Sequence, residues 1–210
     1  HEGRLISSKH YMLLARVKQI QRLSKLINEL ITLSKMSEYS TENLCFTSTN
    51  FSEITIEVAK SFQQMATDQE KSLKYQVKPD VSILSEYKYL YELVNILIDN
   101  AVKYCHPNTT LKIHFSEEKN SFDVSIKMVS IKINDYEIES LSKRGYRSII
   151  AKKININGQG IGMYRIKKTL KLNNAEIFIK PNSFNYKKLH KGLEYEGNEF
   201  IIKFNGQQNW

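Results

Sequence analysis

Residues 99–104 read Asp-Asn-Ala-Val-Lys-Tyr and close a helix that apolar spacing predicts over residues 85–104. The helical period places Asn100, Lys103 and Tyr104 on neighbouring turns of that helix. An asparagine carbonyl oxygen suits a hard metal ion, a lysine ammonium suits a phosphate, and a tyrosine ring suits a base. Taken alone, the same residues also fit an ordinary surface helix.

A second distinctive stretch, Gly-Gln-Gly-Ile-Gly at residues 158–162, precedes a helix predicted over residues 163–172. Glycines let backbone amides approach a phosphate, and a helix presents the positive end of its dipole there. The stretch is not a dinucleotide fingerprint, because the third glycine comes too early and no parallel βαβ unit surrounds it. It is not a P-loop either, because no Gly-Lys-Ser/Thr follows. Alone, it is weak evidence for a phosphate site.

The rest of the chain predicts helices and strands in an α+β order. Helices are expected at residues 5–36, 51–69, 85–104 and 163–172, and strands at residues 73–77, 111–115, 122–126, 176–179 and 200–204. Ser52 is the expected cap of the second helix, and residues 143–159 are expected to be irregular. This order predicts a two-layer α/β sandwich, with helices on one face of a mixed sheet, preceded by a long coiled-coil-like helix.

The N-terminal helix carries a heptad pattern. Leu13, Ile20 and Ile27 recur every seven residues, and Val17 and Ile31 follow the first and third of them by four. Charged and amide side chains occupy the opposite side. The apolar stripe needs a partner that this short segment does not supply by itself, so we expect a homodimer through this helix.

The composition is that of a globular protein. Of the 210 residues, 41% are hydrophobic and 25% are charged, which excludes disordered, collagen-like and disulfide-scaffold classes. Cys45 and Cys105 lack metal-binding spacing, so a reduced cytoplasmic compartment fits best. Apolar runs such as residues 93–98 fall far short of the roughly 20 residues that span a bilayer. We therefore expect a cytoplasmic protein, attached to a membrane only through an upstream segment.

The formal net charge of +9 raises the question of a nucleic-acid partner. The lysines are scattered between Glu and Asn residues, and they form no compact stripe with stacking aromatic side chains. No nucleic-acid partner is expected, and a basic nucleic-acid module ranks as the weakest interpretation.

Taken together and in this order, the motifs resemble the ATP-binding domain of sensor histidine kinases, whose Bergerat-type fold is shared with the gyrase, heat-shock-90 and MutL ATPases. Residues 99–104 resemble the asparagine box of that family, and residues 141–148, Leu-Ser-Lys-Arg-Gly-Tyr-Arg-Ser, resemble the segment that opens its ATP lid. Residues 158–168 resemble its second glycine box, and residues 200–204 its last strand. Residues 22–35 resemble the second helix of the dimerisation and phosphoacceptor hairpin.

The resemblance implies roles for individual residues. Asn100 would ligate Mg²⁺, Lys103 would contact phosphate, and Tyr104 would pack near the adenine. Arg144 and Arg147 in the lid either approach the γ-phosphate, where a guanidinium suits spread negative charge, or are solvated charges. The implied nucleotide-binding residues are Asn100, Lys103, Tyr104, Arg144, Arg147, Gly158, Gln159, Gly160, Ile161 and Gly162.

The resemblance also implies an organisation and an activity. Residues 1–37 would be the dimerisation helix, residues 38–50 a linker, residues 51–205 the ATP-binding catalytic domain, and residues 206–210 a tail. The protein would bind Mg-ATP and transfer the γ-phosphoryl group to a histidine on the dimerisation hairpin, and then to the receiver domain of a response regulator. It would be the cytoplasmic part of a two-component signalling sensor.

The chain departs from the family in its adenine-binding motif. Where the family has Asp-x-Gly-x-Gly, with an aspartate that bonds the adenine amino group, this sequence has Met128, Ser130 and Lys132. Ile96 stands at the first asparagine of the box, although Asn95 is adjacent. These departures favour an alternative, a degenerate ATPase-like domain that acts as a dimeric scaffold or phosphotransfer adaptor without ATP turnover.

No phosphoacceptor motif is convincing, so the catalytic histidine is not assigned. His1-Glu-Gly-Arg4 faintly resembles the family motif, but too few residues follow for a full first helix, a turn and a second helix. His10 lies inside the predicted long helix without an adjacent acid. We expect the phosphoacceptor to lie outside this chain.

Overall fold

A computed structural model describes residues 45–118, 121–154 and 159–205, and six residues nearer the N-terminus: Arg16, Val17, Gln19, Ile20, Leu23 and Ile27. The chain divides into two compact units, His1–Leu44 and Cys45–Trp210. Among the described residues, no helix combines the length and the apolar character that crossing a membrane requires.

In the first unit, all six described residues are helical. Val17, Ile20, Leu23 and Ile27 follow one another at steps of three and four residues, and their side chains are exposed. This spacing is the apolar stripe that the sequence predicts to need a partner. The rest of the predicted helix at residues 5–36 lies outside the described residues, and dimerisation stays a prediction.

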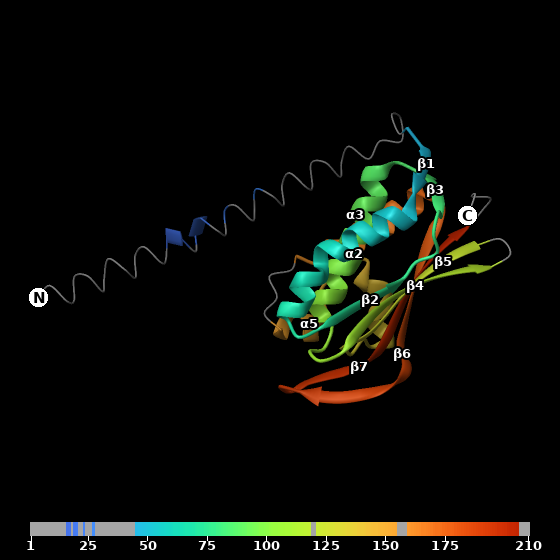
Figure 1. Cartoon of the computed structure of the whole chain (residues 1–210). Coiled ribbons are helices and arrows are strands. Elements are labelled where there is room, and N and C mark those ends of the chain that lie inside the picture. The colour runs from blue at the N-terminus through green and yellow to red at the C-terminus, as the bar shows by residue number, and fades with distance from the viewer. Residues whose placement is uncertain are drawn as a thin grey trace, which may run out of the picture. The chain divides into compact units, whose positions relative to one another are not determined.

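The second unit has two layers, which confirms the predicted α+β sandwich with a mixed sheet. Its five-stranded sheet has the order β2 (Ser72–Gln76), β4 (Thr110–Glu118), β5 (Ser121–Ile131), β7 (Leu193–Asn205) and β6 (Ala175–His190). Strands β2 and β4 are parallel, and the other neighbours are antiparallel. Helices α2 (Phe51–Asp68), α3 (Tyr87–Tyr104) and α6 (Gly162–Leu172) lie on one face of the sheet (Figure 1).

The core forms between the apolar faces of the helices and the sheet. Helix α3 buries Leu90, Leu93, Val94, Leu97, Ile98 and Ala101, the spacing of one helical face. At the end of the core near β4, the Phe51 ring stacks on Phe115 with a centroid distance of 5.6 Å and meets Phe204 edge-on at 5.4 Å. Helix α3 is therefore held along its buried face, which fixes the direction of its polar face.

Two short strands outside the main sheet were not predicted. Strand β1 (Thr47–Asn50) pairs antiparallel with β3 (Ser82–Ser85), and the Thr49 hydroxyl donates a hydrogen bond to the Ser85 carbonyl oxygen at 3.0 Å. Strand β1 falls inside residues 38–50, the predicted linker. Residues 47–50 of that stretch are therefore a strand, while residues 38–44 lie outside the described residues.

The predicted cap of α2 is wrong. Asn50, not Ser52, caps the helix, because its side-chain Oδ1 accepts a hydrogen bond from the Glu53 N–H at 3.1 Å. Ser52 lies inside the first turn and is buried. The helix therefore begins directly after β1, which ends at Asn50.

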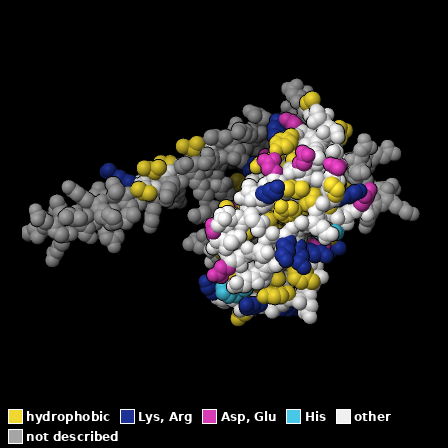
Figure 2. All heavy atoms as spheres, viewed as in Figure 1, with side chains coloured by type: hydrophobic (Ala, Val, Ile, Leu, Met, Phe, Trp, Pro, Cys, Tyr) yellow, Lys and Arg dark blue, Asp and Glu magenta, His cyan; other side chains and the backbone are white. Residues whose placement is uncertain are grey.

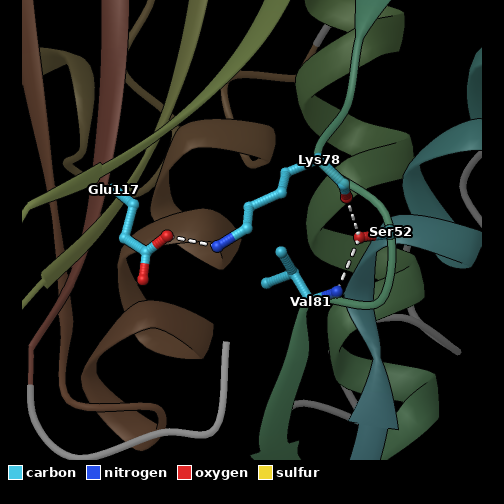
Figure 3. A network of polar contacts seen from close by, with 4 residues as sticks. All are labelled: Ser52, Lys78, Val81 and Glu117. Carbon is cyan, nitrogen blue, oxygen red and sulfur yellow. Dashed lines mark hydrogen bonds and ion pairs between the residues drawn. The ribbon is translucent and has the colours of Figure 1, made fainter.

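Ser52 instead fastens the loop after β2 to α2 (Figure 3). Its hydroxyl donates to the Lys78 carbonyl oxygen at 2.6 Å and accepts from the Val81 N–H at 3.0 Å. The Lys78 ammonium pairs with Glu117 of β4. One buried hydroxyl thus satisfies two backbone groups of a loop that would otherwise lack partners.

The hairpin of β6 and β7 is much longer than predicted. The expected strands at residues 176–179 and 200–204 extend to a turn at Lys191 and Gly192, both with positive φ. The register shifts around Phe184, where the ring lies so close to Gly197 that a Cβ atom there would clash with it. The polar connection between the predicted strands is itself paired strand.

Charged side chains of both signs occupy the surface. Figure 2 shows Lys and Arg side chains in separate groups on the visible face, with Asp, Glu and hydrophobic side chains around them. On this face the basic side chains do not form one continuous stripe.

Candidate functional site

A cavity of about 340 Å³ lies between α3, β5 and the segment that connects β5 to α6. We call residues 134–161 the lid segment; its residues 155–158 lie outside the described residues. It contains a 3₁₀ helix, η2 (Asp135–Glu137), and two short α-helices, α4 (Ile138–Leu141) and α5 (Ile149–Lys153). Helix α5 falls in the stretch predicted to be irregular, and Ser148 caps it by accepting from the Ala151 N–H at 3.1 Å.

Helix α3 brings the three residues of the first motif to this cavity. Asn100, Lys103 and Tyr104 all line it. The Lys103 ammonium pairs with Asp99 one turn earlier. Within the described part of the chain, the side-chain amide of Asn100 has no hydrogen-bond partner, so its donors and its acceptor are available to a ligand. Tyr104 packs against a small apolar cluster made of Val129, Ile131, Ala151 and Tyr195.

The glycine-rich motif meets α3 across the cavity. Gln159, Gly160, Ile161 and Gly162 line the cavity, while Gly158 lies outside the described residues. A Cβ atom at Gly162 would lie 3.2 Å from Asn100 Nδ2 and 3.1 Å from Ile96 Cγ2. A side chain at position 162 would crowd Asn100 and Ile96, so glycine favours this close approach of α6 to α3.

A backbone hydrogen bond joins Gly145 and Gly160, which are distant residues of the lid segment. The Gly145 N–H donates to the Gly160 carbonyl oxygen at 3.0 Å. Gly160 has a φ of +70°, and a Cβ atom there would overlap the Tyr146 carbonyl oxygen. The positive φ and the close approach both require glycine at position 160.

The two lid arginines differ in position. Arg147 lines the cavity, and its Nη2 donates to the Ala151 carbonyl oxygen at 2.8 Å. Arg144 is exposed and is not among the described residues that line the cavity. The structure thus brings Arg147, and not Arg144, to the other predicted site residues.

Across the position of the missing adenine-binding motif, β5 continues as a regular strand. Met128 and Ser130 stand opposite Asn198 and Glu196 of β7 in an unbroken antiparallel ladder. Asn198 is fully buried, and its Nδ2 donates to Ser130 Oγ at 2.9 Å and to the Ile131 carbonyl oxygen at 3.1 Å. A paired strand therefore lines the cavity where the family has Asp-x-Gly-x-Gly.

Glu137 also lines the cavity, although no sequence motif predicts it there. The residue is buried, with 4% of its surface exposed. The Tyr146 hydroxyl donates to Oε1 at 2.9 Å, and Asn134 Nδ2 donates to Oε2 at 2.8 Å. Burial, and then this hydrogen bond to Glu137, raise the pKa of the Tyr146 phenol, so Tyr146 remains a donor at neutral pH. A glutamate in a polar stretch carries no sequence signal of burial.

The described residues include no group of three or more His, Cys, Asp or Glu side chains arranged to hold a metal ion. A metal at this site would need ligand phosphates as well as protein oxygens, which is the usual case for Mg²⁺. The Asn100 carbonyl oxygen and the neighbouring Asp99 carboxylate, which both line the cavity, are the protein oxygens of that kind on α3.

Residues 86–207 match the family model described as histidine kinase-, DNA gyrase B-, and HSP90-like ATPase. Histidine protein kinase SaeS of Staphylococcus aureus (strain MW2) is 23% identical over 169 residues, which cover 78% of this chain and 47% of SaeS. The chain therefore spans about half the length of the curated relatives it matches.

Two solved structures share the fold. Full-length ShkA in complex with AMPPNP has a TM-score of 0.68 and 14% identity, covering 90% of this chain and 37% of ShkA. Histidine kinase ThkA in complex with the response regulator protein TrrA has a TM-score of 0.64 and 16% identity, covering 88% of this chain and 49% of ThkA. These likenesses confirm the architecture that the sequence motifs predicted.

Proposed function

Because this chain belongs to the family of histidine kinase-, DNA gyrase B- and HSP90-like ATPases, we propose that it is the catalytic part of a sensor histidine kinase. It binds Mg-ATP in the cavity between α3 and the lid segment. It transfers the γ-phosphoryl group to a histidine on a dimerisation hairpin, and an aspartate of a response-regulator receiver domain is the next acceptor.

The contact between Gly162 and Asn100 carries this proposal. It joins a side-chain amide without a described partner to the N-terminus of the eleven-residue helix α6. Free backbone N–H groups and the helix dipole attract phosphate at such a terminus. An amide that ligates a metal and a terminus that binds phosphate therefore lie together, as a metal–triphosphate complex requires.

The other site residues take positioning roles. Asn100 would ligate Mg²⁺, which when bound neutralises charge on the phosphate oxygens. Lys103 exchanges its pairing with Asp99 for a phosphate, and Tyr104 packs near the base. Arg147, and by family resemblance Arg144, approach the γ-phosphate. Backbone groups of the glycine-rich motif hold the lid segment against the phosphates.

The chain contributes position and charge rather than a covalent step. The acceptor imidazole nitrogen attacks the γ-phosphorus, and a P–N bond forms as the bond to the bridging oxygen breaks. ADP leaves, and the imidazole proton passes to solvent. The chemistry then depends on bringing the histidine in line with the γ-phosphate.

The partners proposed are a second copy and a receiver domain. The exposed apolar residues Val17, Ile20, Leu23 and Ile27 support a homodimer through residues 1–37. Because the ThkA structure holds a response regulator, a receiver domain is the proposed acceptor here. The proposed location is the cytoplasmic side of a membrane-anchored sensor.

A second candidate is a scaffold or adaptor without ATP turnover. The unbroken ladder at Met128 and Ser130 favours it, because the family's adenine-binding carboxylate is absent there. The retained glycines at 160 and 162 oppose it, since each keeps a close approach beside the cavity.

Calorimetric titration with ATP and ADP, with and without Mg²⁺, decides between the two. We expect micromolar to low-millimolar binding that requires Mg²⁺ and is lost in Asn100→Ala. Asn95→Ala is the matched control, because Asn95 is on the same helix and outside the cavity lining. No binding at millimolar nucleotide in the wild type would leave the scaffold as the function.

A further inference from the structure

Glu137 is a buried carboxylate beside the cavity that the proposed phosphate contacts do not use. Its two described hydrogen bonds come from a phenol and an amide, both neutral donors. Among the residues that the structure describes, it forms no ion pair. Burying a carboxylate without a cation is costly in free energy, so we expect a further interaction to offset that cost.

The carboxylate retains acceptor capacity. Two oxygens offer about four lone-pair sites, and Tyr146 and Asn134 fill one on each oxygen. The remaining capacity suits a ligand that donates a hydrogen bond. It excludes a phosphate as the partner, because two anions repel each other in a buried site.

The position of Glu137 in the chain connects it with the base end of the site. It lies six residues after Ile131, the last residue of β5, and Met128 of that strand stands where the family carries its base-binding aspartate. Met128 is 5% exposed and packs in the main core, and its side chain offers no strong acceptor. Ser130 of β5 also lines the cavity, but its hydroxyl oxygen already accepts a hydrogen bond from the Asn198 side chain. Of the two described carboxylate residues that line the cavity, Asp99 and Glu137, Glu137 is the buried one.

We propose that the Glu137 carboxylate accepts a hydrogen bond from the exocyclic amino group of a bound purine nucleotide and so selects purines that carry one. The inference rests on the proposed function, since it requires a nucleotide in the cavity. The group is the 6-amino group of adenine or the 2-amino group of guanine, and each has its own test.

The test compares nucleotides that differ by one amino group. ATP is compared with purine riboside triphosphate, which lacks the 6-amino group, and GTP with ITP, which lacks the 2-amino group. By calorimetry with Mg²⁺, the wild-type chain should prefer the amino-bearing member of one pair by roughly tenfold or more, the range for a hydrogen bond to a charged group. Equal affinities within both pairs would overturn the inference without any variant.

Glu137→Gln then assigns the preference to this residue. The glutamine keeps an oxygen for the Tyr146 hydroxyl but loses the charge and presents an amide NH₂. The preference should fall below roughly threefold through weaker binding of the amino-bearing nucleotide. The affinity for the amino-free member should stay within about twofold of wild type. Glu139→Gln, an exposed glutamate of α4, is the control and should keep the wild-type preference.

Two results separate the possible failures. An unchanged preference in Glu137→Gln, or an equal loss of affinity for both members of the pair, means that Glu137 only supports the lid segment, and the inference is wrong. If the wild type binds none of the four nucleotides, the proposed function fails and the inference fails with it.

Discussion

Gly162 at the start of α6 and Asn100 in α3 meet with no side chain between them. The contact links two residues that are 62 positions apart in the sequence, and both line one cavity. Ile96, which replaces the first asparagine of the family's box, lies one turn earlier in α3 and is also close to Gly162. The apolar residue at that position lies beside Gly162 in the cavity lining and offers no polar atom to a ligand.

Gly162→Ala should separate nucleotide affinity from stability. A methyl group 3.2 Å from Asn100 Nδ2 displaces the amide by a few tenths of an ångström, and we expect ATP affinity to fall about tenfold, or ~1.4 kcal/mol. Alanine favours a helix over glycine, so the free energy of unfolding should change by less than about 1 kcal/mol. Calorimetry and urea unfolding measure the two effects.

The control for this variant is Lys171→Ala, an exposed position on the same helix. It should leave ATP affinity unchanged. Wild-type affinity in Gly162→Ala would show that the close contact with Asn100 does not matter for the nucleotide.

Ser52→Ala should destabilise the fold. The change leaves the Lys78 carbonyl oxygen and the Val81 N–H without the Ser52 hydroxyl, and unsatisfied buried groups cost about 1–3 kcal/mol. Urea unfolding should show this loss in the free energy of unfolding. Ser61→Ala, on the exposed side of the same helix, should stay within about 0.5 kcal/mol. Equal losses in the two variants would contradict the assigned role.

Stability should fall in mild acid because of His106. Burial lowers the pKa of its imidazole, and positive charge on Lys188, His190 and Lys71 lowers it further. The unfolded histidine, with a pKa of about 6.5, then binds more protons than the folded one. The contribution of His106 to stability is therefore complete above about pH 6.5 and is lost as the pH falls below it.

Urea unfolding of the wild type and two variants at pH 7.5 and pH 5.5 measures this effect. In His106→Gln the decrease in unfolding free energy between the two conditions should be smaller than in the wild type. His114→Gln removes an exposed histidine and should keep the wild-type decrease. A decrease of the same size in all three proteins would rule out His106 as its source.

Helices whose apolar residues recur at helical spacing were predictable from the sequence. The expected helix at residues 85–104 is α3 (Tyr87–Tyr104), because its buried side chains repeat at helical spacing. Strands β1 and β3 were not predictable, since each has four residues and β1 is made of Thr, Ser and Asn. Helix α5 buries only Ala151, so its five residues show no apolar repeat.

The residues of the candidate site that belong to a local motif were predictable, and those that reach the cavity only through tertiary contacts were not. Asn100, Lys103 and Gly162 follow from local spacing, and all three line the cavity. Glu137 is buried and accepts a hydrogen bond from Tyr146, nine residues later in the chain. That contact depends on how the lid segment folds back on itself, and the spacing of apolar residues in the sequence does not predict this path.

The ladder of β5 and β7 has a thermodynamic consequence for any ligand of the cavity. Along residues 128–131, β5 pairs with β7 on one side, and a bridge joins Ser130 to Cys105 on the other, so this backbone has already lost its conformational entropy during folding. Contact with Met128 or Ser130 therefore imposes little further ordering cost on binding. With Asn198 fixing Ser130 and Ile131 in place, this wall of the cavity is preorganised before a ligand arrives.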